Sequence, residues 1–446
     1  MANRARRPAK RVEPDLAVLV DVRGSVLHAG DLRLEESHGQ FQAQFRYTPT
    51  YLDQALLGDA FALDPINLPL KDDVFTTTSR YHRLGALFDA APDAWGRTIM
   101  AKDEKISPTA LTETQVLLKG RGGGVGAIVF ANPSLPMDLT HPRLDLPGVN
   151  DLERIFQTIT AIESGTEVSE ALRAMLMSSW DMGGARPKAV VRDETGTEWI
   201  AKFPRAIDTY SRQRVEWANL EMARAIGMTV PKIALHKLAG GDCALLVKRF
   251  DRTARGHHRH YLSAVSLISP PSRFDKHQLD TAYGASIFSY ERIADVIRRI
   301  SSNVTHDIQE LFARMVLNIL VHNTDDHLKN TGFLMTEEPG FRYRLSPLFD
   351  VVTQEGTLRH LLHLGPGVGP DGERGGRLGT LENARAGARL WGLKTHAVEE
   401  IIIRVQKVLA RRQRYYEAAG MKDGEIGQVE RWLSPEIAAA SQPISR

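Results

Sequence analysis

One short segment of the chain concentrates the side chains that could do chemistry. Residues 322–330 read His-Asn-Thr-Asp-Asp-His-Leu-Lys-Asn and directly follow a predicted apolar helix at 307–321. Phosphoryl transfer needs a carboxylate that accepts the proton of the attacking hydroxyl, and oxygen ligands that hold Mg²⁺ against the phosphates. Protein kinases place these two groups five residues apart on one loop. Asp325 and Asn330 have this spacing, which predicts a catalytic base and a magnesium ligand.

A later carboxylate and an earlier lysine fit the same chemistry. Asp350 ends the segment Leu-Ser-Pro-Leu-Phe-Asp, just after a predicted strand at 341–345, where a second magnesium ligand is expected. Lys202 lies among apolar residues in a predicted strand at 199–203, a suitable position for a cation that binds phosphates. Glu216 lies on the next predicted helix, 214–226, and could pair with Lys202 as the helix glutamate of kinases does.

A glycine-containing segment precedes these strands. Residues 183–188 read Gly-Gly-Ala-Arg-Pro-Lys, and successive backbone N–H groups in such a segment can form a nest for an anion. Five residues are therefore candidate nucleotide contacts: Gly183, Gly184, Ala185, Arg186 and Lys188. The denser glycine run at 120–126 lacks the G-x-G-x-x-G spacing because Val125 occupies the third glycine position. We interpret that run as a structural loop.

Each feature taken alone has a simpler explanation. Asp325 and Asp326 could cap a helix, and Lys202 could lay its aliphatic stem on apolar surface with its amine in water. His322 and His327 could suggest a metal site, but no cysteine or third histidine lies near them in the sequence. The order of the features along the chain, from glycine loop to final aspartate, favours the kinase interpretation.

The hydrophobic pattern predicts an α+β fold. Alternation at 41–47 indicates a half-buried strand, and apolar repeats at 308–320 and 398–409 indicate amphipathic helices. We expect a protein-kinase-like, two-lobed fold with an N-terminal β-rich subdomain and a mainly helical C-terminal lobe. The expected boundaries are a disordered basic tail at 1–14, an N-terminal subdomain at 15–135, a linker at 136–149, a nucleotide-binding lobe at 150–255, a helical catalytic lobe at 256–435 and a tail at 436–446.

Composition excludes several classes of protein. The chain has 446 residues, a net charge of +3 and 25% charged residues, which does not indicate nucleic-acid binding by charge alone. The chain has one cysteine, Cys243, which cannot form an internal disulfide, and this fits a reducing cytoplasm. Cys243 lies in an apolar run, so we expect it to be a core residue. No apolar stretch reaches eighteen residues and no signal core follows the basic N-terminus. We expect a cytoplasmic protein without a membrane span.

Several segments resemble the HipA family of serine/threonine kinase toxins. They are 183–188, 199–204, 246–252, 323–330 and 345–350, while 91–97 and 124–127 are similar to pieces of that family's N-terminal subdomain. The resemblance covers roughly 15–435 and implies a kinase that uses ATP and Mg²⁺. It makes Asp325 the catalytic base, Asn330 and Asp350 magnesium ligands and Lys202 a phosphate ligand. It places Lys248, Arg249 and Phe250 at the hinge near the adenine, and His327 and Lys329 in the nucleotide site.

The resemblance also implies partners. A HipB-like helix-turn-helix antitoxin would bind the kinase, and operator DNA would be contacted mainly through that antitoxin. The protein substrate would be a translation component such as an aminoacyl-tRNA synthetase, whose phosphorylation favours persistence. Two alternatives stay open: a small-molecule kinase with the same core, and a non-catalytic, ATP-binding corepressor of a DNA-binding antitoxin.

One position departs from the family pattern. Many members autophosphorylate a serine that stands seven residues before the position of Lys188, and this chain has Asp181 there. A carboxylate cannot accept phosphate in the same way, although it carries a similar negative charge. Ser178 and Ser179 lie just upstream and are candidate autophosphorylation sites.

Overall fold

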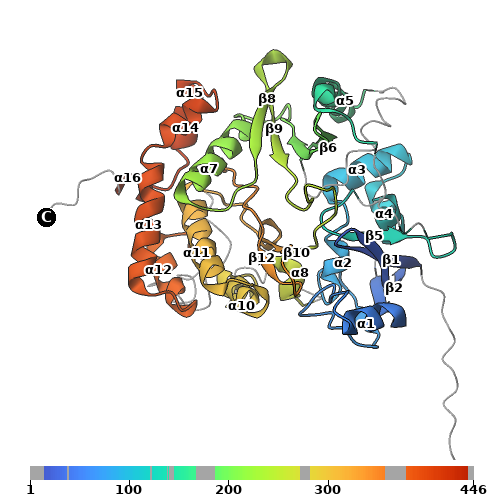
Figure 1. The fold of residues 1–446 in the computed structure, drawn as a ribbon. Coiled ribbons are helices and arrows are strands. Elements are labelled where there is room, and N and C mark those ends of the chain that lie inside the picture. Colours follow the sequence, from blue (N-terminus) through green and yellow to red (C-terminus); the bar gives the residue numbers. More distant parts are fainter. Residues whose placement is uncertain are drawn as a thin grey trace, which may run out of the picture.

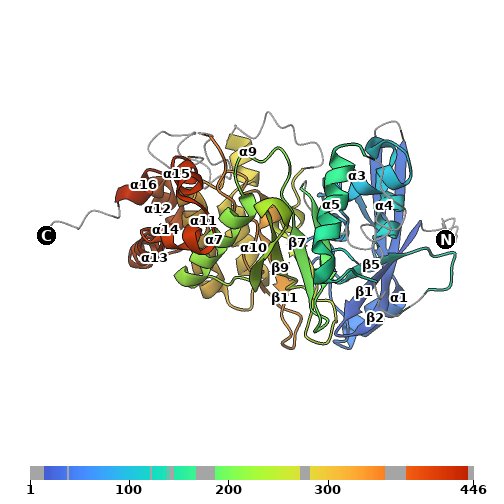
Figure 2. The same cartoon turned by 90° about the horizontal axis from the view of Figure 1, so that it is seen from above.

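The computed structural model describes residues 15–37, 40–120, 123–137, 139, 145–166, 186–271, 282–356 and 378–439. These residues form three antiparallel sheets of five, four and three strands. The five-stranded sheet lies at one end of the molecule, the helices near the C-terminus lie at the other, and the four-stranded sheet lies between them (Figures 1 and 2). The expected tail at 1–14 lies outside the described residues.

The N-terminal sheet has the strand order β4-β3-β2-β1-β5. Its strands are β1 (Leu16–Val22), β2 (Ser25–Ser37), β3 (Gln40–Tyr47), β4 (Phe75–Thr77) and β5 (Ile128–Ala131). The helices of this part are α1 (Pro49–Leu56), α2 (Gly85–Phe88), α3 (Ala94–Asp103) and α4 (Glu113–Lys119). The strand predicted at 41–47 is confirmed by β3, whose Phe45 and Tyr47 are buried.

The central sheet has the order β6-β7-β9-β8 and carries the predicted lysine strand. Its strands are β6 (Lys188–Arg192), β7 (Glu198–Lys202), β8 (Ile233–Lys237) and β9 (Cys243–Lys248), with α5 (Leu152–Glu163) before them and α7 (Arg212–Ile226) between β7 and β8. Lys188 lies opposite Lys202 in the β6–β7 register, so the two lysines are direct neighbours across the sheet. Cys243 is a buried core residue as expected, and burial raises the pKa of its thiol.

The C-terminal part is mainly helical but contains a third sheet. Its strands are β10 (Tyr261–Ser263), β11 (Gly332–Met335) and β12 (Tyr343–Leu345). Of these three strands, only β12 was predicted from the sequence. Its helices are α8 (Ala264–Ile268), α9 (Ala282–Ile287), α10 (Tyr290–Ile300), α11 (Val304–Leu320), α12 (Leu381–Leu390), α13 (Thr395–Leu409), α14 (Arg412–Ala418), α15 (Asp423–Glu430) and α16 (Glu436–Ala439). The described residues of the expected tail at 436–446 are those of α16. Ile437 is buried in α16, and the Glu436 carboxylate accepts the backbone N–H of Leu381.

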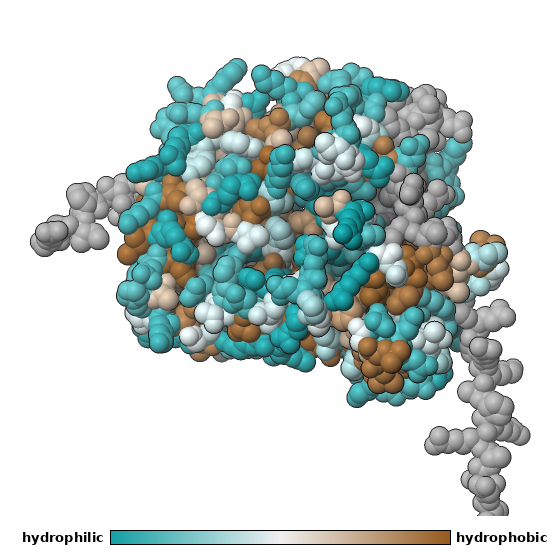
Figure 3. Space-filling view, viewed as in Figure 1, coloured by the Kyte–Doolittle hydropathy of each residue, from teal (hydrophilic) through white to brown (hydrophobic). Residues whose placement is uncertain are grey.

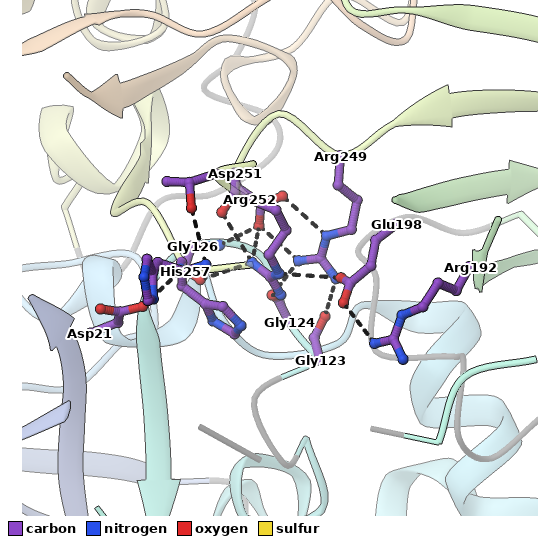
Figure 4. A network of polar contacts seen from close by, with 12 residues as sticks. Asp21, Gly123, Gly124, Gly126, Arg192, Glu198, Arg249, Asp251, Arg252 and His257 are labelled. Carbon is purple, nitrogen blue, oxygen red and sulfur yellow. Dashed lines mark hydrogen bonds and ion pairs between the residues drawn. The ribbon is translucent and has the colours of Figure 1, made fainter. Parts of the chain in front are cut away.

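A buried ionic cluster joins the end of β9 to the N-terminal subdomain (Figure 4). Arg249 is 1% exposed, and it donates to the Asp251 carboxylate and to the carbonyl oxygens of Gly123 and Gly124. The Asp251 carboxylate also accepts the backbone N–H of Gly126 at 2.8 Å. The glycine run at 120–126, as far as it is described, is therefore the structural loop that the sequence predicted.

One hydrophobic core continues from the N-terminal sheet through the central sheet into the helical part. The face seen in Figure 3 is mostly polar, with an apolar patch near α1, at whose end Leu56 and Leu57 are 87% and 78% exposed. Among the described residues, no helix combines the length and the apolar character needed to cross a membrane.

Candidate active site

A cavity of about 510 Å³ lies where the central sheet, the N-terminal subdomain and the 325–330 loop meet. Residues far apart in the sequence therefore line the same cavity. The predicted site residues that line it are Arg186, Lys188, Lys202, Glu216, Phe250, Asp325, His327, Lys329, Asn330 and Asp350. The sequence order of the motifs thus corresponds to a single spatial cluster.

Some predicted residues are placed elsewhere. Lys248 is exposed and Arg249 is held in the ionic cluster, so neither side chain lines the cavity. Val247 and Phe250 do line it, so the end of β9 still borders the site. Six further candidates lie outside the described residues: Gly183, Gly184, Ala185, Ser178, Ser179 and Asp181.

The ammonium group of Lys202 lies between two carboxylates of the cavity wall. Its Nζ lies 2.6 Å from Glu216 Oε1 and 2.8 Å from Asp350 Oδ1. Burial opposes its positive charge, but Asp350 and Glu216 more than offset this and raise the pKa of Lys202 above its ordinary value. Lys202 is thus a fixed cation, paired with a helix glutamate as the sequence predicted.

Asp350 is held in an unusual backbone conformation with φ +63°. Its backbone N–H donates to Glu216 Oε1 at 3.1 Å, so one glutamate positions both Lys202 and Asp350. Burial opposes ionisation, but Lys202 and Lys188 hold the pKa of the Asp350 carboxyl well below its usual range. A non-glycine residue with positive φ and a strongly shifted pKa is characteristic of functional sites.

The two adjacent aspartates of the 325–330 loop have different environments. Asp326 is 6% exposed and accepts a hydrogen bond from the hydroxyl of Tyr290, so it holds the loop in place. Asp325 is exposed and lines the cavity. Although its side chain is open to solvent, partial desolvation by the surrounding cavity walls and the charge of Asp350 raise the pKa of Asp325, while His327, 3.9 Å away, opposes the rise.

The residues fit a magnesium ion. Nδ2 of Asn330 donates to the Asp325 carbonyl oxygen at 2.9 Å, which fixes the amide and leaves its Oδ1 as the acceptor. Together with Asp350, this gives an amide oxygen and a carboxylate, the hard oxygen donors that Mg²⁺ prefers. Within the described ranges, no group of three or more His, Cys, Asp or Glu side chains could hold a metal. Nucleotide-bound Mg²⁺ usually keeps phosphate and water oxygens as its other ligands.

The N-terminal subdomain contributes residues that the sequence analysis did not assign to the site. Asp89 and Asp93 line the cavity, and Asp93 Oδ1 lies 2.5 Å from Lys329 Nζ. Arg212, at the start of α7, also lines it and donates to Gln354 Oε1 at 3.1 Å. The segment Ala-Pro-Asp-Ala-Trp at 91–95 carried a signal for Asp93, because it is similar to the N-terminal part of the family.

Sequence comparison identifies the family. The sequence model of the HipA-like C-terminal domain matches residues 180–412. This chain belongs to the HipA-like family. The match contains β6 to β12 and every lining residue named above except Asp89 and Asp93.

Curated relatives of this HipA-like chain match over shorter stretches. It is 31% identical over 172 residues to the protein named "Putative kinase Y4dM" of Sinorhizobium fredii, covering 36% of this chain and 38% of that protein. It is 26% identical over 142 residues to a "Putative kinase" of Haemophilus influenzae, covering 31% and 40%. The matches therefore span about two-fifths of the length of these relatives.

A solved structure covers nearly the whole chain. A chain of the Shewanella oneidensis MR-1 toxin–antitoxin complex of HipA, HipB and operator DNA superposes with a TM-score of 0.66 over 96% of each chain, at 18% identity. This similarity confirms the predicted α+β, HipA-like fold.

Proposed function

We propose that this HipA-family chain is an ATP- and magnesium-dependent kinase that phosphorylates serine or threonine on a protein. The observation that carries the proposal is the grouping of Lys202, Glu216 and Asp350 in the same cavity as Asp325 and Asn330. Kinases need a phosphate cation, metal ligands and a base around one nucleotide. The relatives named as kinases support the same activity.

In the proposed reaction, Lys202 holds the phosphates of ATP and Asp325 orients the acceptor hydroxyl. Asn330 and Asp350 would hold Mg²⁺, which when bound neutralises charge on the phosphates. The hydroxyl oxygen forms a bond to the γ-phosphorus, and its proton passes to the Asp325 carboxylate. The bond from the γ-phosphorus to the β–γ bridging oxygen breaks, and ADP leaves with that electron pair.

We further propose that the kinase is the toxin of a toxin–antitoxin pair. The fold shared with a complex of HipA, HipB and operator DNA supports a HipB-like antitoxin that would carry the chain onto operator DNA. An aminoacyl-tRNA synthetase is the proposed substrate class. Ser178 and Ser179 are the proposed autophosphorylation sites, in view of Asp181.

The test is incubation of the purified chain with labelled ATP, Mg²⁺ and a cell lysate, beside Asp325→Asn. The variant keeps the size of the side chain but removes the carboxylate that accepts the proton. Asp72→Asn is the matched control, because Asp72 is a 62% exposed aspartate that pairs with Arg46 and does not line the cavity. A lysate protein labelled by the native chain and by Asp72→Asn, but not by Asp325→Asn, would support the proposal.

Other outcomes have distinct meanings. Equal labelling by Asp325→Asn would remove this residue from the base role. If ATP binds but no label is transferred to any protein, the result would contradict a protein kinase and favour a small-molecule acceptor or a corepressor role. Label on the chain itself is to be located by mass spectrometry, with Ser178 and Ser179 as the expected positions.

A further inference from the structure

One arginine of the catalytic cavity takes no part in the proposed reaction. Arg212 is the first residue of α7, and its half-buried side chain lines the cavity. It precedes Glu216 by four residues, about one helical turn, so the two side chains lie on the same face of α7. Arg212 therefore faces the same space as the glutamate that positions Lys202 and Asp350.

The guanidinium of Arg212 is anchored on one side. Its Nη1 donates to the hydroxyl oxygen of Tyr210 at 2.9 Å and to Gln354 Oε1 at 3.1 Å. Its Cζ atom lies 5.7 Å from the centroid of the Tyr210 ring. Tyr210 is itself 6% exposed, and its hydroxyl donates to the carbonyl oxygen of Thr353. These contacts give the arginine a defined position.

Gln354 joins this arginine to the segment that carries the base. Its Nε2 donates to the Val352 carbonyl oxygen at 3.2 Å, which leaves Oε1 as the acceptor for Arg212. The Gln354 N–H donates to the His322 carbonyl oxygen at 3.0 Å, and His322 Nδ1 lies 3.0 Å from the Gln354 carbonyl oxygen. Because His322 begins the segment that contains Asp325, Arg212 is positioned relative to the base.

The opposite edge of the guanidinium has no partner. Among the described residues, nothing accepts a hydrogen bond from Nε or Nη2 of Arg212, and neither nitrogen is buried. Lys202, Lys329 and Arg186 of the same cavity each form an ion pair with a carboxylate, whereas Arg212 forms none within the described ranges. The parallel N–H groups of this edge have the geometry that binds two oxygens of a phosphate.

The location of Arg212 determines which phosphate it can meet. Partial desolvation raises the pKa of Asp325, and the charges of His327 and Arg212 oppose that rise, so Arg212 lies within electrostatic range of the base. In the proposed reaction the base holds the hydroxyl oxygen that attacks the γ-phosphorus, and such reacting atoms are about 3–3.5 Å apart. An anchored cation near Asp325 therefore lies near the γ-phosphoryl group.

We propose that the Nε–Nη2 edge of Arg212 binds two oxygens of the γ-phosphoryl group of ATP. This inference rests on the proposed kinase function and adds a second phosphate ligand to Lys202. Negative charge is spread over these oxygens during transfer, so the contact persists while the bond to the bridging oxygen breaks and the bond to the acceptor oxygen forms. Since ADP has no γ-phosphoryl group, Arg212 should distinguish ATP from ADP.

The test is calorimetry of the full chain with Mg²⁺ and either ADP or adenylyl imidodiphosphate, a non-hydrolysable analogue of ATP. We expect Arg212→Gln to weaken binding of the analogue about tenfold or more, and to leave the affinity for ADP unchanged. Arg212→Lys keeps the charge but loses the fork, and should recover part of the loss. The matched control is Arg224→Gln, which removes an exposed arginine of the same helix outside the cavity and should bind both nucleotides as the native chain does.

A further variant tests the anchor. Gln354→Leu leaves the charge of Arg212 in place but removes the acceptor that orients it, and should weaken binding of the analogue by less than Arg212→Gln does. Its affinity for ADP should again match that of the native chain.

The possible outcomes separate this contact from the kinase activity. Native affinity for the analogue in Arg212→Gln would overturn the inference and leave the arginine to the acceptor or to the fold. An equal loss of affinity for ADP and the analogue would also overturn it, because the effect would not involve the γ-phosphoryl group. A native chain that binds neither nucleotide would refute both proposals. The expected change in Arg212→Gln without any phosphate transfer by the native chain would support the contact and refute the kinase alone.

Discussion

The ammonium group of Lys329 lies 2.5 Å from the carboxylate of Asp93, although 236 residues separate them in the chain. Lys329 belongs to the 325–330 loop, whereas Asp93 immediately precedes α3 in the N-terminal subdomain. The ring of Tyr81, from the same subdomain, lies 5.0 Å from the Lys329 Nζ. The N-terminal subdomain therefore holds the loop that carries the proposed base.

A second set of contacts joins the N-terminal subdomain to the end of the same loop. The Asp89 carboxylate accepts the backbone N–H and the hydroxyl of Ser263, each at 2.7 Å. The next residue, Ala264, donates its N–H to the carbonyl oxygen of Thr331, directly after the loop. Burial raises the pKa of Asp89 to about 6, although the hydrogen bonds from Ser263 oppose the rise, so at neutral pH it is an ionised acceptor.

We predict that Asp93→Asn lowers kcat by about tenfold to hundredfold, because a small displacement of the base is costly to a positioned reaction. ATP affinity should change less than kcat, since Lys202 and Asp350 are untouched. Asp93→Glu restores the charge and should recover part of kcat. Steady-state kinetics together with calorimetry separates these effects, and an unchanged kcat in Asp93→Asn would show that the ion pair has no role in positioning.

We predict that Lys202→Ala weakens ATP binding by about 1.5–3 kcal/mol, the usual contribution of a hydrogen bond to a charged group. Glu216→Gln should have a smaller effect, because the lysine would remain while its orientation is loosened. Calorimetric titration of ATP with Mg²⁺ provides the measurement, with the exposed Lys407 near the end of α13 as the site of a control substitution to alanine. Native affinity in Lys202→Ala would exclude this lysine from the phosphate site.

The rate of phosphate transfer should fall as the pH drops below the pKa of Asp325, because only the ionised carboxylate can accept the hydroxyl proton. This fall is the acidic limb of the pH–rate profile. Burial raises the pKa of Asp325, and the nearby His327 lowers it, so replacing the histidine should raise this pKa further. We therefore predict that His327→Gln moves the acidic limb of the rate profile to higher pH. A limb that stays in place or moves to lower pH would mean that His327 does not act on the base.

Local sequence patterns predicted which side chains would lie together. Asp325, Asn330, Asp350, Lys202 and Glu216 have the spacing of a known reaction, and the structure brings them to one cavity. Helix α11 was equally predictable, because its apolar residues repeat with helical periodicity and are buried.

The remaining features depend on long-range contacts. Strands β10 and β11 are three and four residues long, which is too short for a periodic signal, and they are defined by pairing with each other. Arg249 was expected at the nucleotide hinge, but its direction is set by Asp251 and by two carbonyl groups of a distant glycine loop. The pairing of Lys329 with Asp93 likewise depends on how two subdomains meet, which single-sequence reasoning does not predict.

We predict that Asp251→Asn destabilises the protein, because a neutral amide removes the carboxylate nearest to the buried cations Arg249 and Arg252 and leaves Glu198, at 3.6 and 3.2 Å from them, as their remaining counter-charge. Breaking a buried ion pair in this way costs about 3–5 kcal/mol. Urea denaturation gives the measurement. Asp72→Asn, which removes an exposed partner of Arg46, should cost no more than about 1 kcal/mol.

The difference in unfolding free energy between the native chain and Asp251→Asn should depend on pH in a defined direction. Burial opposes ionisation of Asp251, but Arg249 and Arg252 hold its pKa well below the usual range. A carboxyl group whose pKa is depressed by folding contributes its stability above the unfolded pKa, about 3.9, and loses it as the pH falls toward the folded pKa. The gap between the native chain and Asp251→Asn should thus be constant from pH 7 to about pH 5 and should narrow below about pH 4. A gap that widens on acidification would contradict the ionic role assigned to Asp251.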